Sequence, residues 1–222
     1  MEALLFDFDG VIIDSVPVRT RGFRQIFEGY PAEAVEALIA YHRINGGISR
    51  FVKIRYFFET LLRTPITEAK VQEFAGRYSQ IMRSELADFS VIIPETLEFI
   101  RRIHGRVRLH IASGSEEQEL RWLCETLGIA AFFDSIHGSP TPKTTLVADL
   151  MAARGYRREA VCLIGDSIND YEAAEASGIG FFGYNNPELR GTGAGYIEGF
   201  AGLDLNDLSG GRYSLQSAKG DA

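Results

Sequence analysis

The hydrophobic and polar positions of this chain follow two different patterns. Residues 4–8 form a short, mainly apolar run, which predicts a buried strand. From residue 15 to residue 87 the apolar positions recur at helical spacing, and glycine and proline interrupt them at three places. This stretch predicts four helices, at residues 18–28, 32–44, 50–62 and 68–86.

After residue 88, short apolar runs alternate with segments of helical spacing. The runs predict strands at 107–112, 132–137, 161–164, 179–182 and 196–197, and the segments predict helices at 94–103, 116–127, 143–154, 171–176 and 200–205. Strands that alternate with helices of this length form a parallel sheet through right-handed crossovers. The predicted fold class is therefore α/β: a Rossmann-like parallel sheet core domain with an inserted all-helical cap domain.

The change of pattern sets the predicted domain boundaries. Residues 1–14 and 88–208 are expected to form the α/β core, and residues 15–87 the helical cap. The small, polar residues of 209–222 predict a disordered tail.

The composition excludes several functional classes. The chain has 222 residues, 45% of them hydrophobic, which is enough for a sizeable buried core. Its net charge of -7 at pH 7 gives no reason to expect a nucleic-acid or anionic-membrane partner. The first residues resemble neither a secretory signal nor a spanning helix, so a cytoplasmic location is expected. Cys124 and Cys162 show no motif spacing and are expected to be buried thiols.

Polar groups follow four of the predicted strands, and ligands of parallel sheets bind at the carboxyl ends of the strands. In strand order these groups are Asp7 and Asp9, Ser113 and Gly114, Lys143, and Asp166 and Asp170. Two unit charges ~4 Å apart repel by about 4 kcal/mol at an effective dielectric near 20, so the acidic pairs predict a cation. Carboxylates without nearby His or Cys suit Mg²⁺ rather than zinc. The hydroxyl, amide and ammonium groups are donors for phosphate oxygens.

This ordered set resembles the motifs of the haloacid dehalogenase superfamily over about the first 200 residues. Asp7 and Asp9 match the DxD motif, Ser113 and Lys143 match the next two motifs, and Asp166 and Asp170 match GDxxxD. Each motif alone is weak, but four in order are specific. The resemblance implies an enzyme, a Mg²⁺-dependent phosphoric monoester hydrolase.

The resemblance also implies a role for each of these residues. Asp7 would be the nucleophile that forms an aspartyl-phosphate, and Asp9 the general acid and then base, with its pKa tuned upward by a neighbouring carboxylate. The metal would be held by Asp7, Asp166 and the backbone carbonyl of Asp9, with Asp170 in support. Ser113, Gly114 and Lys143 would bind the phosphoryl oxygens.

The helical insertion is similar to the cap of phosphoglycolate phosphatases and β-phosphoglucomutases. A cap of this kind closes over the site and contacts the rest of the substrate. Arg50 follows a glycine-hinged loop, Gly46 to Ser49, and is a candidate substrate contact. The same loop also fits a glycine helix stop followed by Ser49 as the N-cap of the next helix. Arg19 is a second candidate, and a solvated helix face is the alternative for it.

Two departures, at Arg19 and Asp9, separate this chain from particular relatives. Arg19 stands near the place where sugar-phosphate mutases usually have a histidine, which favours a phosphatase over a phosphomutase. Lys53 stands near the Schiff-base lysine of phosphonate hydrolases, but a surface lysine is the simpler interpretation. Those hydrolases generally lack the second acid of the DxD motif, and Asp9 is present. The aromatic residues at 51–58 are predicted to form cap core.

The leading hypothesis is hydrolysis of a small phosphorylated metabolite of the phosphoglycolate or sugar-phosphate type. A phosphomutase is the alternative among enzymes, followed by a phosphonate hydrolase. The alternative class is a non-catalytic relative that only binds a ligand or partner, but binding alone does not require Asp9. The sequence leaves the substrate and the oligomeric state open.

Overall fold

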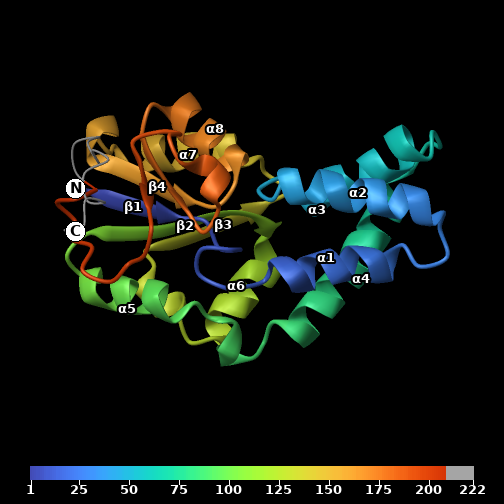
Figure 1. Cartoon of the computed structure of the whole chain (residues 1–222), viewed down its shortest axis with the longest axis horizontal. Coiled ribbons are helices and arrows are strands. Elements are labelled where there is room, and N and C mark those ends of the chain that lie inside the picture. The colour runs from blue at the N-terminus through green and yellow to red at the C-terminus, as the bar shows by residue number, and fades with distance from the viewer. Residues whose placement is uncertain (209–222) are drawn as a thin grey trace, which may run out of the picture.

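The computed structural model describes residues 1–208, which are built around one parallel sheet (Figure 1). Its strand order is β3-β2-β1-β4-β5-β6. The strands are β1 Ala3–Phe6, β2 Arg108–Glu116, β3 Ser135–Ser139, β4 Val161–Gly165, β5 Gly180–Tyr184 and β6 Gly195–Ile197. The winding direction reverses between β1 and β4, which pair in parallel with Phe6 opposite Ile164. Ligands of parallel α/β sheets bind at such a switch point.

Helices cover both faces of the sheet because its strands are apolar on both sides. Strand β1 is fully buried: Leu4 and Phe6 pack into one hydrophobic cluster, and Ala3 and Leu5 into another. Helices α5 Pro94–Ile103 and α6 Glu117–Thr126 contribute to the first cluster, and α7 Lys143–Arg154 and α8 Ile168–Ser177 to the second, on the opposite face in Figure 1. The result is a three-layer core.

The other four long helices form a cap that is inserted between β1 and β2, to the right in Figure 1. They are α1 Val16–Ile26, α2 Ala32–Ile44, α3 Arg50–Arg55 and α4 Glu68–Glu85. A π-helical turn, Tyr56–Leu61, continues α3. Its Phe57 is buried and stacks on Phe27 with ring centroids 3.9 Å apart, which confirms that these aromatic residues are cap core. Short 3₁₀ turns lie at Phe89–Val91, Ala130–Phe132, Arg158–Ala160 and Pro187–Leu189.

The predicted fold class is confirmed, and most element boundaries agree closely. Helices α2, α5 and α7 begin and end at the predicted residues. The prediction of a helix at 200–205 is wrong, because this segment consists of turns. Strand β2 continues to Glu116, beyond a break in its register with β3, and so includes Ser113 and Gly114. The predicted tail at 209–222 lies outside the described residues.

Two predictions from composition are also tested. Cys124 and Cys162 are both buried and unpaired, as expected. None of the helices in residues 1–208 has the length and hydropathy that crossing a bilayer requires.

Candidate active site

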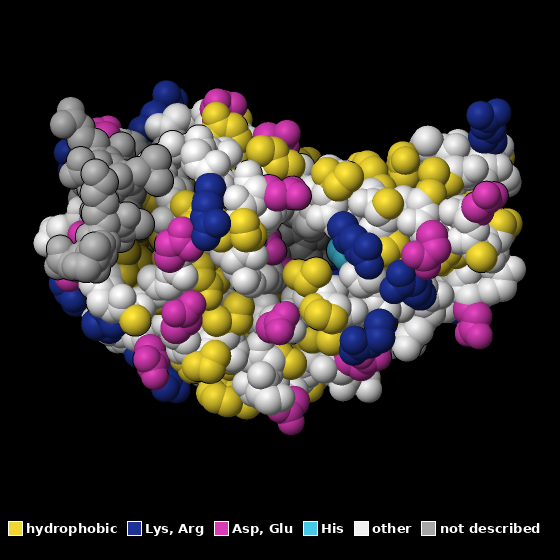
Figure 2. Space-filling view, viewed as in Figure 1, with side chains coloured by type: hydrophobic (Ala, Val, Ile, Leu, Met, Phe, Trp, Pro, Cys, Tyr) yellow, Lys and Arg dark blue, Asp and Glu magenta, His cyan; other side chains and the backbone are white. Residues whose placement is uncertain are grey.

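A cavity of about 470 Å³ lies between the carboxyl ends of the strands and the cap. Figure 2 shows the surface hollowed where the two parts meet. Its core wall includes Asp7, Asp9, Ser113, Gly114, Ser115 and Asp166, and its cap wall includes Arg19, His42, Gly46, Gly47, Arg50, Lys53 and Tyr78. Residues from widely separated parts of the sequence therefore line one cavity.

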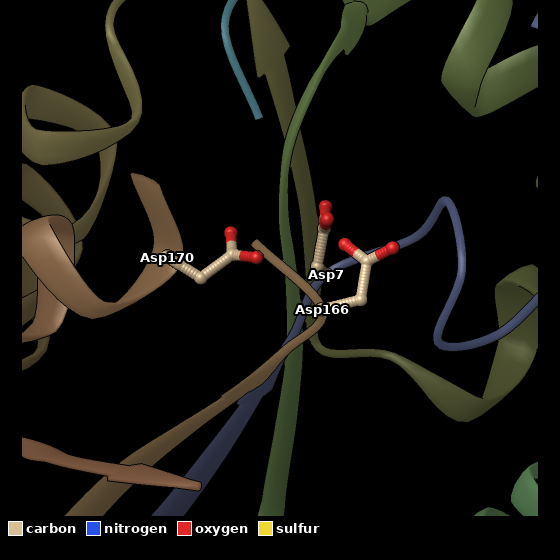
Figure 3. Close-up of side chains that lie close together, drawn as sticks. All are labelled: Asp7, Asp166 and Asp170. Atoms are coloured by element: carbon tan, nitrogen blue, oxygen red, sulfur yellow. The ribbon is translucent and has the colours of Figure 1, made fainter. Parts of the chain in front are cut away.

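Three carboxylates converge here, two of which, Asp7 and Asp166, line the cavity (Figure 3). Asp7 follows β1, Asp166 follows β4, and Asp170 lies in the first turn of α8. One oxygen of each lies within 4.8 Å of the others. Oδ1 of Asp7 is buried and pairs with the ammonium of Lys143, which leaves its second lone pair for a cation. The donor set and its spacing fit a hard divalent cation such as Mg²⁺.

Lys143 supplies the positive charge next to these acids. Its Nζ lies 2.9 Å from Oδ1 of Asp7 and also contacts Oδ1 of Asp170. Burial and the charge of Asp170 raise the pKa of Asp7 to about 7, although Lys143 acts in the opposite direction. Burial and the charge of Asp7 likewise raise the pKa of Asp166 well above its ordinary value. The protein without metal therefore holds protons that a cation must displace.

Metal binding should depend on this protonation. Below the pKa of Asp7, about 7 without metal, each displaced proton weakens the apparent Mg²⁺ affinity about tenfold per pH unit. Affinity should thus increase as the pH rises through about 7. Calorimetric titration of metal-free protein with MgCl₂ at several pH values measures this. Thermal denaturation should show a larger Mg²⁺-induced stabilisation at about pH 8 than at about pH 6. An affinity that is constant across this range would contradict the assignment.

Asp170 is held in place by the start of α8. Its Oδ2 accepts hydrogen bonds from the backbone N–H of Ser167 at 3.0 Å and from Oγ of Ser167 at 2.9 Å, which forms a capping box. The backbone at Gly165 packs so closely that an added Cβ would lie 2.4 Å from the Asp170 side chain. Asp170 is therefore positioned by local structure, beside Asp7.

Asp9 accepts hydrogen bonds at both of its carboxylate oxygens. Its Oδ1 accepts hydrogen bonds from Nε of Arg19 at 2.8 Å and from Oγ of Ser15, and its Oδ2 accepts one from Oγ of Ser115 at 2.6 Å. Burial acts to raise the pKa of Asp9, but the charge of Arg19 and these hydrogen bonds outweigh it and lower the pKa. The expectation that the pKa of Asp9 is tuned upward is wrong for this state, because cap and core donors stabilise the carboxylate.

A buried glutamate connects the core to the cap. Glu119 in α6 accepts hydrogen bonds from Nη1 of Arg19 at 2.6 Å and from Nη1 and Nη2 of Arg50 at 2.5 and 2.8 Å. Arg50 also donates to Oγ of Ser79 at 2.7 Å. The alternative that Arg19 lies on a solvated helix face is wrong, because Arg19 is only 5% exposed. The two cap arginines thus share one carboxylate from the core.

The cap loop 45–49 lies directly against the core loops of the site. A Cβ added at Gly114 would lie 2.2 Å from the carbonyl oxygen of Gly47, and one added at Gly47 would lie 2.9 Å from Oγ of Ser167. Only glycine allows this approach of two backbones. The arrangement is therefore a cap closed over the site, not one held away from it.

Sequence reasoning missed several members of the site. Glu119 gave no signal, since a glutamate in an amphipathic helix is ordinarily exposed. The interpretation of Lys53 as a surface residue is wrong: it is 2% exposed and lines the cavity. Asn185 and Asn186 after β5 donate to the carbonyls of Gly10 and Asp166 at 3.0 and 2.8 Å and hold the acid loops. Their position after a strand end was the one available signal.

Comparison with known proteins agrees with this geometry. The family model of haloacid dehalogenase-like hydrolases matches residues 1–178, most of the chain. The chain belongs to this family. A phosphorylated carbohydrates phosphatase of Thermotoga maritima is 26% identical to this hydrolase over 189 residues, which cover 81% of the chain and 82% of the relative.

Two further relatives extend the likeness. A phosphoglycolate phosphatase of Aliivibrio fischeri is 24% identical over 200 residues, covering 85% of this hydrolase and 87% of the relative. The crystal structure of β-phosphoglucomutase from Clostridium difficile superimposes with a TM-score of 0.72 at 19% identity, covering 94% of this chain and 95% of that one. At this identity the structural likeness concerns the fold.

Proposed function

We propose that this hydrolase is a Mg²⁺-dependent phosphatase of a small phosphorylated metabolite, of the phosphoglycolate or sugar-phosphate type, with residues 15–87 as its cap. The observation that carries the proposal is the convergence of Asp7, Asp166 and Asp170 with Lys143 in contact with Asp7. The names of the similar phosphatases support the same reaction class.

In the first half of the reaction a carboxylate oxygen of Asp7 attacks the phosphorus atom. The bond between phosphorus and the ester oxygen breaks, and the leaving oxygen takes a proton from Asp9. This gives an aspartyl-phosphate on Asp7 and the free alcohol. Ser113, the backbone N–H of Gly114 and Lys143 bind the phosphoryl oxygens, and the charge of Lys143 offsets the repulsion between an anionic nucleophile and an anionic substrate.

In the second half Asp9 accepts a proton from water, and the water oxygen attacks phosphorus. The bond to Asp7 breaks, which releases phosphate and restores the carboxylate. The lowered pKa of Asp9, kept low by Arg19, Ser15 and Ser115 against the effect of burial, suits its role as the base. For the first half a bound phosphate offsets the charge of Arg19, so that Asp9 holds a proton until the alcohol leaves.

The metal would be held by Asp7, Asp166 and the backbone carbonyl of Asp9, with Asp170 in support through Lys143. When bound, Mg²⁺ supplies positive charge that stabilises the transferring phosphoryl group and keeps Asp7 ionised. The closed cap excludes bulk water.

A screen of phosphorylated metabolites tests the proposal. Purified protein should release inorganic phosphate from at least one monoester with Mg²⁺, and excess EDTA should reduce the rate to background. Monoesters should lose phosphate to water without a bisphosphate activator, which distinguishes a phosphatase from a phosphomutase. Absence of metal-dependent phosphate release across phosphoglycolate, sugar, glycerol and nucleoside phosphates would contradict it.

A further inference from the structure

The cap wall of the cavity contains a buried lysine without a carboxylate partner. The Lys and Arg side chains that are buried in residues 1–208 are Arg19, Arg50, Lys53 and Lys143. Each of these except Lys53 forms an ion pair with a carboxylate. No described carboxylate lies within 4.0 Å of Nζ of Lys53. A buried ammonium without a counterion is unfavourable, so this site lacks a negative charge.

The two hydrogen-bond partners of Lys53 are neutral. Its Nζ lies 3.0 Å from Nδ1 of His42 and 3.2 Å from the carbonyl oxygen of Gly46. Burial and the charge of Lys53 lower the pKa of His42 to about 3, so the imidazole is uncharged at neutral pH. When Nδ1 accepts a hydrogen bond from the ammonium, Nε2 carries the ring proton. Nε2 is therefore a donor, and it is buried without a partner among the described residues.

Arg19 provides a third donor on the same wall. Its Nε and Nη1 are engaged by Asp9 and Glu119, but its Nη2 is buried and has no partner in the described part of the chain. Arg19, His42 and Lys53 all line the cavity, and the charge of Arg19 lowers the pKa of both His42 and Lys53. Buried donors are normally satisfied. Two donors without a partner and one ammonium without a counterion on the same cavity wall indicate a ligand with several oxygen acceptors.

This wall faces the reaction centre across the cavity. Burial lowers the pKa of Lys53 to about 7, and the charges of Asp9 and Asp166 act in the opposite direction. In the proposed reaction the phosphate that is cleaved lies at Asp7, next to Ser113 and Lys143. A group that contacts Lys53 is therefore a second part of the substrate molecule, apart from that phosphate.

We propose that Lys53, together with Nε2 of His42 and Nη2 of Arg19, binds a second anionic group of the substrate. The preferred substrate then carries a carboxylate or a second phosphate in addition to the phosphate that is cleaved. This inference rests on the proposed phosphatase function. It assigns the selection of substrates to the uncompensated ammonium of Lys53 in α3, assisted by donors from α1 and α2, because binding supplies the counterion that the folded protein lacks.

Matched substrate pairs test the inference in the wild-type protein. The first pair is 2-phosphoglycolate and 2-hydroxyethyl phosphate, and the second is fructose 1,6-bisphosphate and fructose 1-phosphate. In at least one pair the more anionic member should have a kcat/KM about 10- to 100-fold higher, mainly through a lower KM. The pair that shows the preference identifies the second anion as a carboxylate or as a phosphate. No preference in either pair would overturn the inference.

The Lys53→Met variant assigns the preference to the ammonium. It should abolish the difference within the preferred pair, because kcat/KM of the more anionic member should fall at least about tenfold more than kcat/KM of the less anionic member when an apolar chain of similar length replaces the ammonium. Lys70→Met, at an exposed lysine in α4, is the matched control. Equal losses for both members of a pair would show a structural role and overturn the inference.

A binding measurement separates this inference from the proposed function. In the presence of Mg²⁺, calorimetry should show tighter binding of phosphonoacetate than of 2-hydroxyethylphosphonate, by about tenfold or more, in the wild type but not in Lys53→Met. These analogues are not hydrolysed as monoesters. If the metabolite screen fails but this difference is found, the function is wrong and the anion site stands. Equal binding of the two phosphonates, together with no preference in the fructose pair, would overturn the anion site.

Discussion

Asp7→Asn should reduce turnover of any accepted substrate by about 10⁴-fold or more, because an amide oxygen is a poor nucleophile toward phosphorus. The fold should persist. Asp7 is one of three mutually repelling carboxylates, and burial already opposes its charge. Lys143 keeps its contact with Asp170 in the variant. The metal-free variant should therefore melt no lower than the wild type.

Two measurements test this result. Steady-state phosphate release gives the loss of turnover, and the binding of beryllium fluoride with Mg²⁺, followed by thermal denaturation, reports the aspartyl-phosphate analogue on Asp7. The variant should lose both. Asp149→Asn, at an exposed carboxylate in α7, is the control and should retain both. Turnover retained by Asp7→Asn would exclude Asp7 as the nucleophile.

Glu119→Gln should weaken the closed contact between cap and core. The carboxylate of Glu119 is fully buried and accepts hydrogen bonds from Arg19 and Arg50. Removal of one partner of a buried ion pair typically destabilises a protein by about 3–5 kcal/mol, because the remaining charge is left uncompensated. Here the arginines belong to the cap and can regain water when the cap separates from the core. The open form should therefore become populated before the protein unfolds.

Small-angle X-ray scattering and limited proteolysis of the linkers near residues 14 and 88 should detect this opening. The rate of phosphate release should fall as the cap opens, because Arg19 is then no longer held beside Asp9. Glu36→Gln is the matched control: Glu36 accepts two hydrogen bonds from Arg24, but at the surface. Such an exposed pair contributes about 1 kcal/mol or less. A closed and fully active Glu119→Gln variant would contradict the proposed role of the pair.

The core of the fold was predictable from local pattern. Helices 32–44, 94–103 and 143–154 were predicted at the residues where they occur, since periodic apolar positions between glycine, proline and polar breaks carry that information. The helix predicted at 200–205 does not form. Gly202 in that segment has a φ of 76°, outside the helical region, and the carbonyls of Phe200 and Leu203 accept hydrogen bonds from Arg102.

The sequence by itself determined the α/β core, the helical insertion, and the acidic, hydroxyl and ammonium groups at the strand ends. It could do so because strand ends and the spacing of apolar residues are local properties of the chain. Only the tertiary structure decided how those groups are charged and what faces them. Glu119, His42 and Lys53 belong to none of the motifs, and their burial follows from the cap closing on the core. The lowered pKa of Asp9 and the uncompensated charge of Lys53 likewise depend on contacts between residues far apart in the chain.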